Sequence, residues 1–283
     1  MKRFIQKSLL FMLIILSINT YFFQIVYENY YSEYEHVELD FKTYLLSDSH
    51  GKPLDKINEP LKFYNFSAGS DSYVDMKRKL QFLAEKSNIE RLIITADNHT
   101  LSPYRDKSNN VDRSSFFTKF SFENKPYKHL KENYIERYLP IINPKSRDIV
   151  KLFLLAEEEP IKSEPNWKAL KPKEKSAFAK RRTARQFRKL YPSKIQTSAL
   201  HEIIDICKQN DIELVGIKYP LSREYLAAMG NSTFQADSIL MSKKSKIYDF
   251  SNIYINQDHL FRNQDHLNED GGRLFTDLIL NLE

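Results

Sequence analysis

Short apolar runs alternate with helical patterns through most of the chain after residue 41. The apolar runs predict strands, because each is short and is bounded by polar or turn-forming residues. Between them, apolar residues recur every three or four positions, as on one face of an amphipathic helix. The pattern predicts five strands, at 43–46, 61–66, 92–95, 212–218 and 246–250, and three well-marked helices, at 72–86, 197–209 and about 270–282.

The helix predicted at 197–209 shows this periodicity most clearly. Either Thr197 or Ser198 is the expected N-cap. We interpret Cys207 as a core thiol; because it is the only cysteine, it can form no intrachain disulfide and no Cys/His zinc cluster. The apolar positions of this helix fall at i, i+3, i+4 and i+7: Leu200, Ile203, Ile204 and Cys207.

Strands that alternate with helices indicate parallel strands covered by helices on both faces. We expect a three-layer, flavodoxin-like α/β domain with a mostly parallel five-strand sheet. Residues 100–196 break the alternation: this stretch is polar, contains several prolines, and predicts a mainly helical insertion that acts as a lid or side wall. Ligands of such sheets bind at the carboxyl ends of the strands, so the residues after each strand are the candidates for chemistry.

The N-terminus carries an uncharged apolar run. Lys2, Arg3 and Lys7 precede residues 8–26, which as a helix would span about 28 Å, close to the thickness of the hydrocarbon core. A cleaved signal peptide would show a shorter apolar run and a small-x-small site, so we favour an uncleaved transmembrane helix, a signal anchor. A buried helix of a soluble domain is the remaining alternative.

Positive charges on the short N-terminal side predict that this end is cytoplasmic. The protein would then be a single-pass membrane protein with its α/β domain periplasmic or extracellular, and membrane lipid would be a partner of the N-terminal helix. A chain starting near Tyr34 is expected to be soluble. The expected segments are a cytoplasmic n-region at 1–7, a transmembrane anchor at 8–26 and a juxtamembrane linker at 27–40. The α/β domain follows at 41–283 and contains the insertion at about 100–196.

Composition excludes several classes of protein. An aromatic content of 13% excludes a disordered or fibrous chain. Six glycines and the absence of a Gly-rich phosphate loop disfavour a nucleotide-binding enzyme, and no cofactor is expected. The net charge is +6, yet residues 171–189 alone hold nine basic residues and one acid. This stretch is either a solvated helix face or a contact for anionic lipid or glycan, and nucleic acid is not an expected partner.

Polar blocks follow the predicted strands. Ser-Asp-Ser-His-Gly (47–51) follows the first strand, Ser-Ala-Gly-Ser-Asp-Ser (67–72) the second, and Asp-Asn-His (97–99) the third. A fourth block, residues 263–271, precedes the last helix. In order and spacing the four blocks resemble the SGNH (GDSL-type) hydrolase superfamily, over 43–283 apart from the insertion. The likeness is to membrane-anchored members of the cell envelope, such as alginate O-acetyltransferase-like proteins and the teichoic acid D-alanyl transfer protein.

This resemblance implies a serine esterase or O-acyltransferase. It would move an acyl group, most simply acetyl, on an envelope or exported polysaccharide through an acyl-serine intermediate. Ser49 would be the nucleophile and His266 its base. The backbone N–H groups of Ser49 and Gly69 and the side-chain amide of Asn98 would stabilise the oxyanion. The implied partners are a polysaccharide or acylated sugar and an acyl-donor membrane protein.

The chain departs from the family pattern at several positions. Ser47 stands where the first block usually has glycine, and His99 where the third usually has Asp. Asn263 occupies the position of the catalytic acid, three residues before His266. An amide orients an imidazole but stabilises its charge less well than a carboxylate; Asp265 could replace it with altered geometry. A Ser–His dyad, a shifted site and a catalytically silent glycan-binding or assembly protein all stay open.

Asn-Gln-Asp-His-Leu occurs twice, at 256–260 and 263–267. Only the second copy is followed by the Asn and Gly that lead into the last helix. We therefore choose His266 over His259 as the base.

Other polar residues near the strand ends have simpler interpretations. His50 and His99 could form a metal site with His266, but no paired spacing such as H-E-x-x-H supports one, and no metal is expected. Asp48 is expected to be a turn acceptor. Tyr104 and Arg105 are either substrate contacts or surface residues.

Overall fold

A computed structural model describes residues 1–118, 127, 130–155 and 166–282. The chain forms two compact units. The helical unit comprises Met1–His36 and Asp112–Lys162, and the α/β unit comprises Val37–Val111 and Ser163–Glu283. The middle of the expected insertion thus clusters with the N-terminal helix.

The sheet of the α/β unit has the order β2-β3-β1-β4-β5-β6. Its strands are β1 (Thr43–Leu46), β2 (Ile57–Asn58), β3 (Phe63–Asn65), β4 (Arg91–Thr95), β5 (Glu213–Lys218) and β6 (Lys246–Asp249). All neighbours pair in parallel except β2, which runs antiparallel to β3. The prediction of a five-strand sheet is therefore wrong by one edge strand, because two residues are too few to show any alternation of polar and apolar positions.

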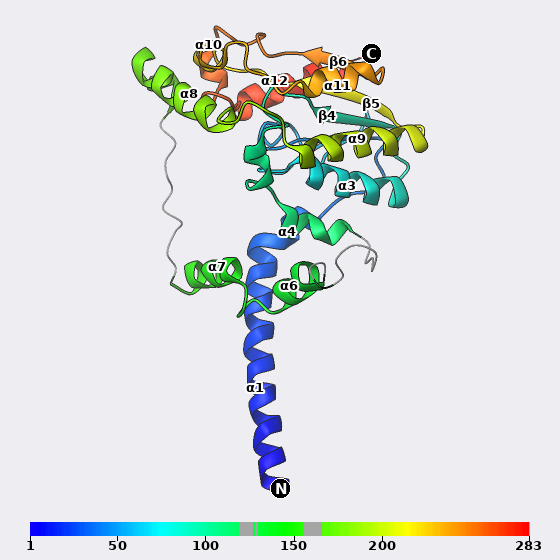
Figure 1. The fold of residues 1–283 in the computed structure, drawn as a ribbon, viewed down its shortest axis with the longest axis vertical. Coiled ribbons are helices and arrows are strands. Elements are labelled where there is room, and N and C mark those ends of the chain that lie inside the picture. Colours follow the sequence, from blue (N-terminus) through cyan, green and yellow to red (C-terminus); the bar gives the residue numbers. More distant parts are fainter. Residues whose placement is uncertain (119–126, 128–129, 156–165, 283) are drawn as a thin grey trace. The chain divides into compact units, whose positions relative to one another are not determined.

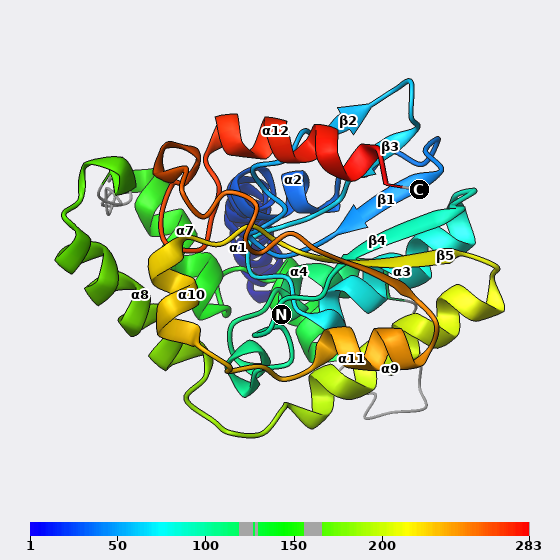
Figure 2. The same cartoon turned by 90° about the horizontal axis from the view of Figure 1, so that it is seen from above.

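Helices lie on both faces of this sheet (Figure 2). Helix α12 (Glu269–Leu280) lies on one face, where Phe275 and Ile279 are buried in one cluster with Leu45, Ile93 and Val215 of the central strands. Helices α3 (Tyr73–Lys86) and α9 (Lys194–Gln209) pack against each other on the other face. The unit also contains α8 (Pro172–Gln186), α10 (Arg223–Met229), α11 (Ala236–Ser242) and the short 3-10 turns η2 (Pro103–Asp106), η5 (Trp167–Ala169) and η6 (Asp258–Leu260).

The start of α9 corrects one expectation. The helix is capped by Ser193, whose Oγ accepts a hydrogen bond from the backbone N–H of Gln196 at 3.2 Å, and not by Thr197 or Ser198. Its first turn, Lys194 to Gln196, has no apolar repeat that would reveal it in the sequence. Cys207 is buried on this helix, as interpreted above.

The helical unit is built around α1 (Lys2–Val26), which continues through a π-turn, η1 (Tyr27–Tyr31), into α2 (Ser32–Glu35) (Figure 1). Together they form a helix long and apolar enough to cross a membrane. The remaining elements are α4 (Val111–Ser114), η3 (Ser115–Phe117), η4 (Lys131–Ile135), α6 (Glu136–Tyr138) and α7 (Pro144–Leu155). The parts of the predicted helical insertion at 119–126, 128–129 and 156–165 lie outside the described residues.

Candidate active site

Ser49 and His266 meet at the carboxyl edge of the sheet, although 217 residues separate them in the chain. Ser49 lies in the loop after β1, and His266 lies in the loop before α12. The Oγ atom of Ser49 is 2.7 Å from Nε2 of His266. Ser49 is half-buried and opens on a cleft of about 530 Å³. The cleft is also lined by Lys52, Pro53, Arg262, Leu267, Asn268, Glu269 and Asp270.

Asn263 fixes the orientation and tautomer of the His266 ring. Its Oδ1 accepts hydrogen bonds from the backbone N–H groups of Asp265 and His266, at 3.2 and 3.0 Å. The same oxygen lies 2.8 Å from Nδ1 of His266. Because this oxygen can only accept, Nδ1 must carry the ring proton, and Nε2 then presents its lone pair to the Ser49 hydroxyl. Asn263 is therefore placed to orient the ring of His266.

Asp265 adds a charge to the same nitrogen. Its Oδ1 lies 3.2 Å from Nδ1 of His266, and its Oδ2 lies 2.7 Å from Nε of Arg182. Burial would raise the pKa of Asp265, but the His266 ring and the Arg182 guanidinium hold it well below its usual range. The pKa of His266 itself is lowered, because burial outweighs the attraction of Asp265 and because the His50 and Arg182 cations oppose protonation. The geometry thus brings both candidate acids, Asn263 and Asp265, to the candidate base His266.

Helix α8 binds both copies of the Asn-Gln-Asp-His-Leu repeat. Arg182 pairs with Asp265 in the second copy, and Lys175 pairs with Asp258 in the first at 2.7 Å. Lys175 and Arg182 are seven residues apart, which is about two turns of α8. The two aspartates are also seven residues apart, one in each copy of the repeat. Part of the basic stretch 171–189 is therefore a docking face within the protein. His259 of the first copy is exposed, so the structure brings His266 to Ser49 and leaves His259 on the surface.

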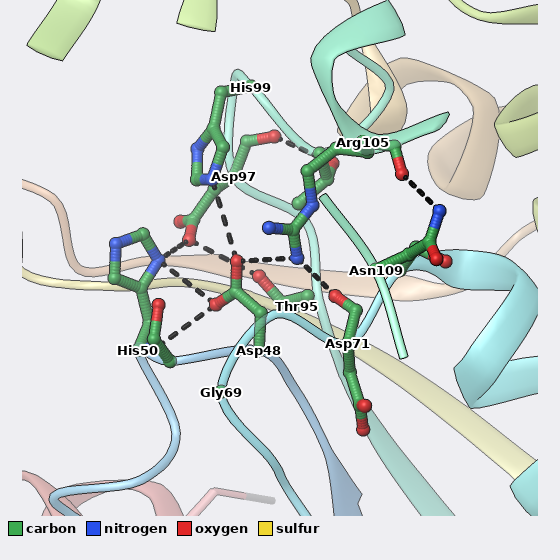
Figure 3. A network of polar contacts seen from close by, with 12 residues as sticks. Asp48, His50, Gly69, Asp71, Thr95, Asp97, His99, Arg105 and Asn109 are labelled. Carbon is green, nitrogen blue, oxygen red and sulfur yellow. Dashed lines mark hydrogen bonds and ion pairs between the residues drawn. The ribbon is translucent and has the colours of Figure 1, made fainter. Parts of the chain in front are cut away.

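The neighbours of Ser49 in the chain, Asp48 and His50, belong to a buried network of charges (Figure 3). Nδ1 of His50 is 2.6 Å from Oδ2 of Asp97 and 3.5 Å from Oδ1 of Asp48. Burial opposes a charge on His50, but these two carboxylates raise its pKa to about 10, so the ring is a cation at neutral pH. The backbone N–H of Tyr219, at the end of β5, donates to the other oxygen of Asp97 at 2.8 Å.

Asp48 and Arg105 complete the network. The guanidinium of Arg105 donates to Oδ2 of Asp48 at 3.0 Å and also to the backbone carbonyl of Asp71. Burial would raise the pKa of Asp48, but the His50 and Arg105 cations hold it well below its usual range. Arg105 is only 5% exposed, so it is neither a surface residue nor a substrate contact in this arrangement. Asp48 is more than a turn acceptor, although its Oδ1 does accept from the backbone N–H of His50 at 3.0 Å.

His50 connects this network to the Ser49–His266 pair. Its Nε2 lies 3.7 Å from Oδ2 of Asp265, and the His50 and His266 rings lie 4.8 Å apart between centroids. From the sequence, His50 is considered only as a metal ligand, Arg105 only as a substrate contact or surface residue, and neither Asp97 nor Arg182 is given a role. Their local sequence does not show that they contact one another, and only the fold brings them together.

Among the residues that the structure describes, two groups of side chains could offer ligands to a metal ion. They are Asp48, His50 and His99, and His50, Asp265 and His266, with ligand atoms within 4.8 Å of one another. In each group the carboxylate already accepts from an arginine, Arg105 on Asp48 and Arg182 on Asp265. A divalent cation would face the charge of that guanidinium, so the chemistry of these groups fits ion pairing better than metal binding.

Of the predicted oxyanion donors, the side-chain amide of Asn98 is occupied by other contacts, whereas Gly69 borders open space. The side-chain amide of Asn98 donates to the backbone carbonyl of Ser232 at 3.3 Å and contacts the sulfur of Met229. Gly69 lies beside the charged network, and a Cβ at this position would meet only the side chain of Lys52, at 3.5 Å. Gly69 thus leaves open space that the protein itself does not fill, whereas Asn98 is engaged elsewhere.

Two glycines at the start of α12 hold the two site loops together. A Cβ on Gly272 would lie 1.9 Å from the carbonyl oxygen of Pro53, in the loop that carries Ser49. A Cβ on Gly271 would lie 2.3 Å from the carbonyl oxygen of Leu260, where the chain leads into the loop of His266. Only hydrogen fits at either position, so the backbone of α12 rests directly on both loops.

In comparisons with known proteins, no family model and no curated protein matches this chain.

Proposed function

We propose that this protein is a membrane-anchored serine esterase or O-acyltransferase of the SGNH type, and that its α/β unit has the three-layer, flavodoxin-like arrangement of that superfamily. The observation that carries the proposal is the line of contacts from Ser49 through His266 to Asn263, at 2.7 and 2.8 Å, beside an open cleft. The substrate is an acylated, most simply acetylated, envelope or exported polysaccharide. The anchor is α1, with its N-terminus in the cytoplasm and the α/β unit outside the membrane.

The proposed reaction has two half-reactions. Nε2 of His266 takes the hydroxyl proton of Ser49 as its oxygen bonds to the ester carbonyl carbon, which gives a tetrahedral oxyanion. The oxyanion collapses, the alkoxy group leaves with the proton from His266, and acyl-Ser49 remains. Water or a sugar hydroxyl then attacks the acyl carbon, His266 takes the proton of this acceptor, and Ser49 recovers it as the acyl group departs. Water gives hydrolysis, and a sugar gives transfer from an acyl donor held by a partner membrane protein.

The surroundings of the pair support this chemistry. Asn263 orients the ring without charge, while Asp265 at 3.2 Å stabilises the imidazolium that forms. The N–H groups of Ser49 and Gly69 are the proposed oxyanion donors. Cationic and anionic side chains both line the cleft, including Lys52, Arg262 and Asp270, which suits a hydroxyl-rich substrate.

The alternative is a catalytically silent glycan-binding or assembly protein of the cell envelope. One observation favours it: the amide of Asn98 is engaged by Ser232, so the third expected oxyanion donor points elsewhere.

Labelling with a fluorophosphonate serine probe separates the two proposals. The wild type should form a covalent adduct that Ser49→Ala and His266→Ala both abolish while the circular dichroism spectrum is unchanged. His259→Ala is the matched control, because it alters the same residue in the duplicate repeat and should label normally. A wild type that does not label, and does not turn over acetylated sugars, would make the silent protein the better proposal.

A further inference from the structure

A segment of the helical unit lies against the apolar stretch of α1. The side-chain amide of Asn19 donates to the backbone carbonyl of Tyr138 at 2.9 Å. The rings of Phe23 and Tyr138 lie 5.3 Å apart between centroids. Figure 1 shows α6 and α7 on either side of this helix. Residues far along the chain therefore touch the part of α1 that is apolar enough to lie in a membrane.

The position of the Asn19–Tyr138 contact along α1 determines how deep it would lie in the membrane. Asn19 precedes Val26 by seven residues, so it lies about 10 Å before the end of the apolar stretch at 1.5 Å per residue. If residues 8–26 span the hydrocarbon core, Tyr138 lies within it. A backbone carbonyl there needs a partner, since lipid offers no hydrogen bond. Asn19, itself 8% exposed, supplies that partner, which accounts for an amide inside an apolar stretch.

Helix α7 packs against α1 and η1 on the C-terminal side of the Asn19–Tyr138 contact. Val150 is buried in a cluster with Ile25, Val26 and Tyr31. At the start of α7, Lys145 pairs with Asp112 at 2.8 Å and lies over the ring of Tyr30. The polar start of α7 is thus level with the residues that follow the apolar stretch of α1, and the middle of α7 is level with its last residues.

The outer surface of this layer is apolar and exposed. A groove of about 340 Å³ runs across it, lined by Phe22, Pro140, Ile141, Val150, Leu154 and Leu155 together with Arg147 and Lys151. Further large apolar side chains are exposed on the same segment: Leu139, Ile142 and Phe153. A contiguous exposed apolar patch of this kind is typical of a surface that contacts a membrane or another molecule. It is continuous with the apolar surface of α1, because Phe22 lines the same groove.

We propose that residues 138–155 are seated in the bilayer leaflet crossed by the C-terminal end of α1, with a phospholipid acyl chain in the groove and Arg147 and Lys151 at the headgroup phosphates. Two long cationic side chains beside an apolar groove match the two parts of a phospholipid. The inference rests on the anchoring by α1 in the proposed function. It adds a second membrane contact, which restricts the tilt and rotation of the helical unit at the surface.

Measuring the depth of labelled residues in the bilayer, with the full-length protein, tests whether residues 138–155 lie in the leaflet. Single cysteines at Ile142 and Leu154 would carry an environment-sensitive fluorophore, and Cys207 is buried and should not react. The protein would be reconstituted in phosphatidylcholine vesicles containing phosphatidylglycerol and a nitroxide-labelled lipid. Both probes should shift to the blue and be quenched several-fold more than a probe at Leu190, which is 97% exposed in the α/β unit.

A probe at Ile14, in the apolar stretch of α1, separates the two possible failures. Quenching at Ile14 without quenching at Ile142 and Leu154 would overturn the seat and leave the anchor intact. No quenching at any of the three would overturn both. Blue-shifted but unquenched probes at Ile142 and Leu154 would also overturn the proposal, because they would indicate that protein, and not lipid, covers the groove.

Discussion

Arg182 binds one oxygen of Asp265 at 2.7 Å while the other oxygen of the same carboxylate faces Nδ1 of His266 at 3.2 Å. The carboxylate is therefore shared between helix α8 and the proposed base. The basic stretch, which by composition alone is either a solvated helix face or a contact for an anionic lipid or glycan, contributes in this way to the inside of the site.

Arg182→Gln should reduce the rate of ester turnover several-fold at neutral pH, because Asp265 loses the contact that holds it against His266. The same change removes a cation that keeps the pKa of His266 low. The acid limb of the pH–rate profile should therefore move to higher pH. Lys175→Gln breaks the corresponding pair with Asp258 and should leave that profile in place. Equal effects of the two changes would mean that α8 acts on stability alone.

Asn263→Asp should raise kcat/KM, by about tenfold or about 1.4 kcal/mol, since a carboxylate keeps the same contacts and adds a charge next to the imidazolium. In the wild type the pKa of His266 is lowered, so activity should persist below pH 6.5 and be lost as His266 becomes protonated. The added carboxylate raises that pKa and moves the loss to higher pH. Rate profiles of both proteins between pH 4 and 8 measure the effect, and an unchanged profile would contradict it.

Gly272→Ala should separate the two site loops. The added Cβ would lie 1.9 Å from the carbonyl oxygen of Pro53, so either α12 or the loop of Ser49 must move. We expect a loss of roughly 1–3 kcal/mol in the free energy of unfolding, as for other overpacked sites, together with at least a tenfold loss of activity. Arg273→Ala changes the next, exposed residue of the same helix and should do neither.

His50 should make stability fall in the alkaline range. Its pKa is raised from 6.5 to about 10 in the folded protein, so its contribution is complete below pH 6.5 and is lost as the pH rises toward 10. The free energy of unfolding should decline over this window by at most about 1.4 kcal/mol per pH unit. Urea titrations at several pH values measure the slope, and His50→Gln should flatten it. A wild type with a flat profile would show that the ring is neutral.

Removal of residues 1–33 should now leave the rest of the chain prone to aggregate. The α/β pattern alone suggests that a chain starting near Tyr34 is soluble, but Val150 packs against Ile25, Val26 and Tyr31. Deleting 112–162 as well, with a flexible linker in its place, should restore a monomer. Size-exclusion chromatography without detergent compares the two forms, and a monomeric first form would contradict the expectation.

The sequence predicted those features that leave a local pattern. The central strands, α3, α9 and α12 could be found because their apolar periodicity is strong, and Ser49 and His266 because each lies in a polar block at a predicted element end. β2 and the Ser193 cap could not, since neither carries such a pattern.

The charged network behind the site could not be predicted for a different reason. His50 follows β1, whereas Asp97 and Arg105 follow β4, and each by itself lies in a segment with the composition of an ordinary turn. What makes them part of the site is burial together, which depends on the strand order of the sheet. The contact between Asn19 and Tyr138 is likewise a long-range pairing without a local signal.

The direct contact of α12 with the Pro53 and Leu260 backbones has a consequence for how the site depends on the stability of the fold. Regions of a protein can open separately, but α12 also buries Phe275 and Ile279 in the core cluster of the sheet. A displacement of α12 would remove the backbone support of both site loops at once, and only side-chain contacts such as Ser49–His266 and Arg182–Asp265 would then still hold them. The arrangement of the two loops is thus tied directly to the packing of α12 on the core, so a change in the core that shifts this helix would reach the site without altering any of its side chains.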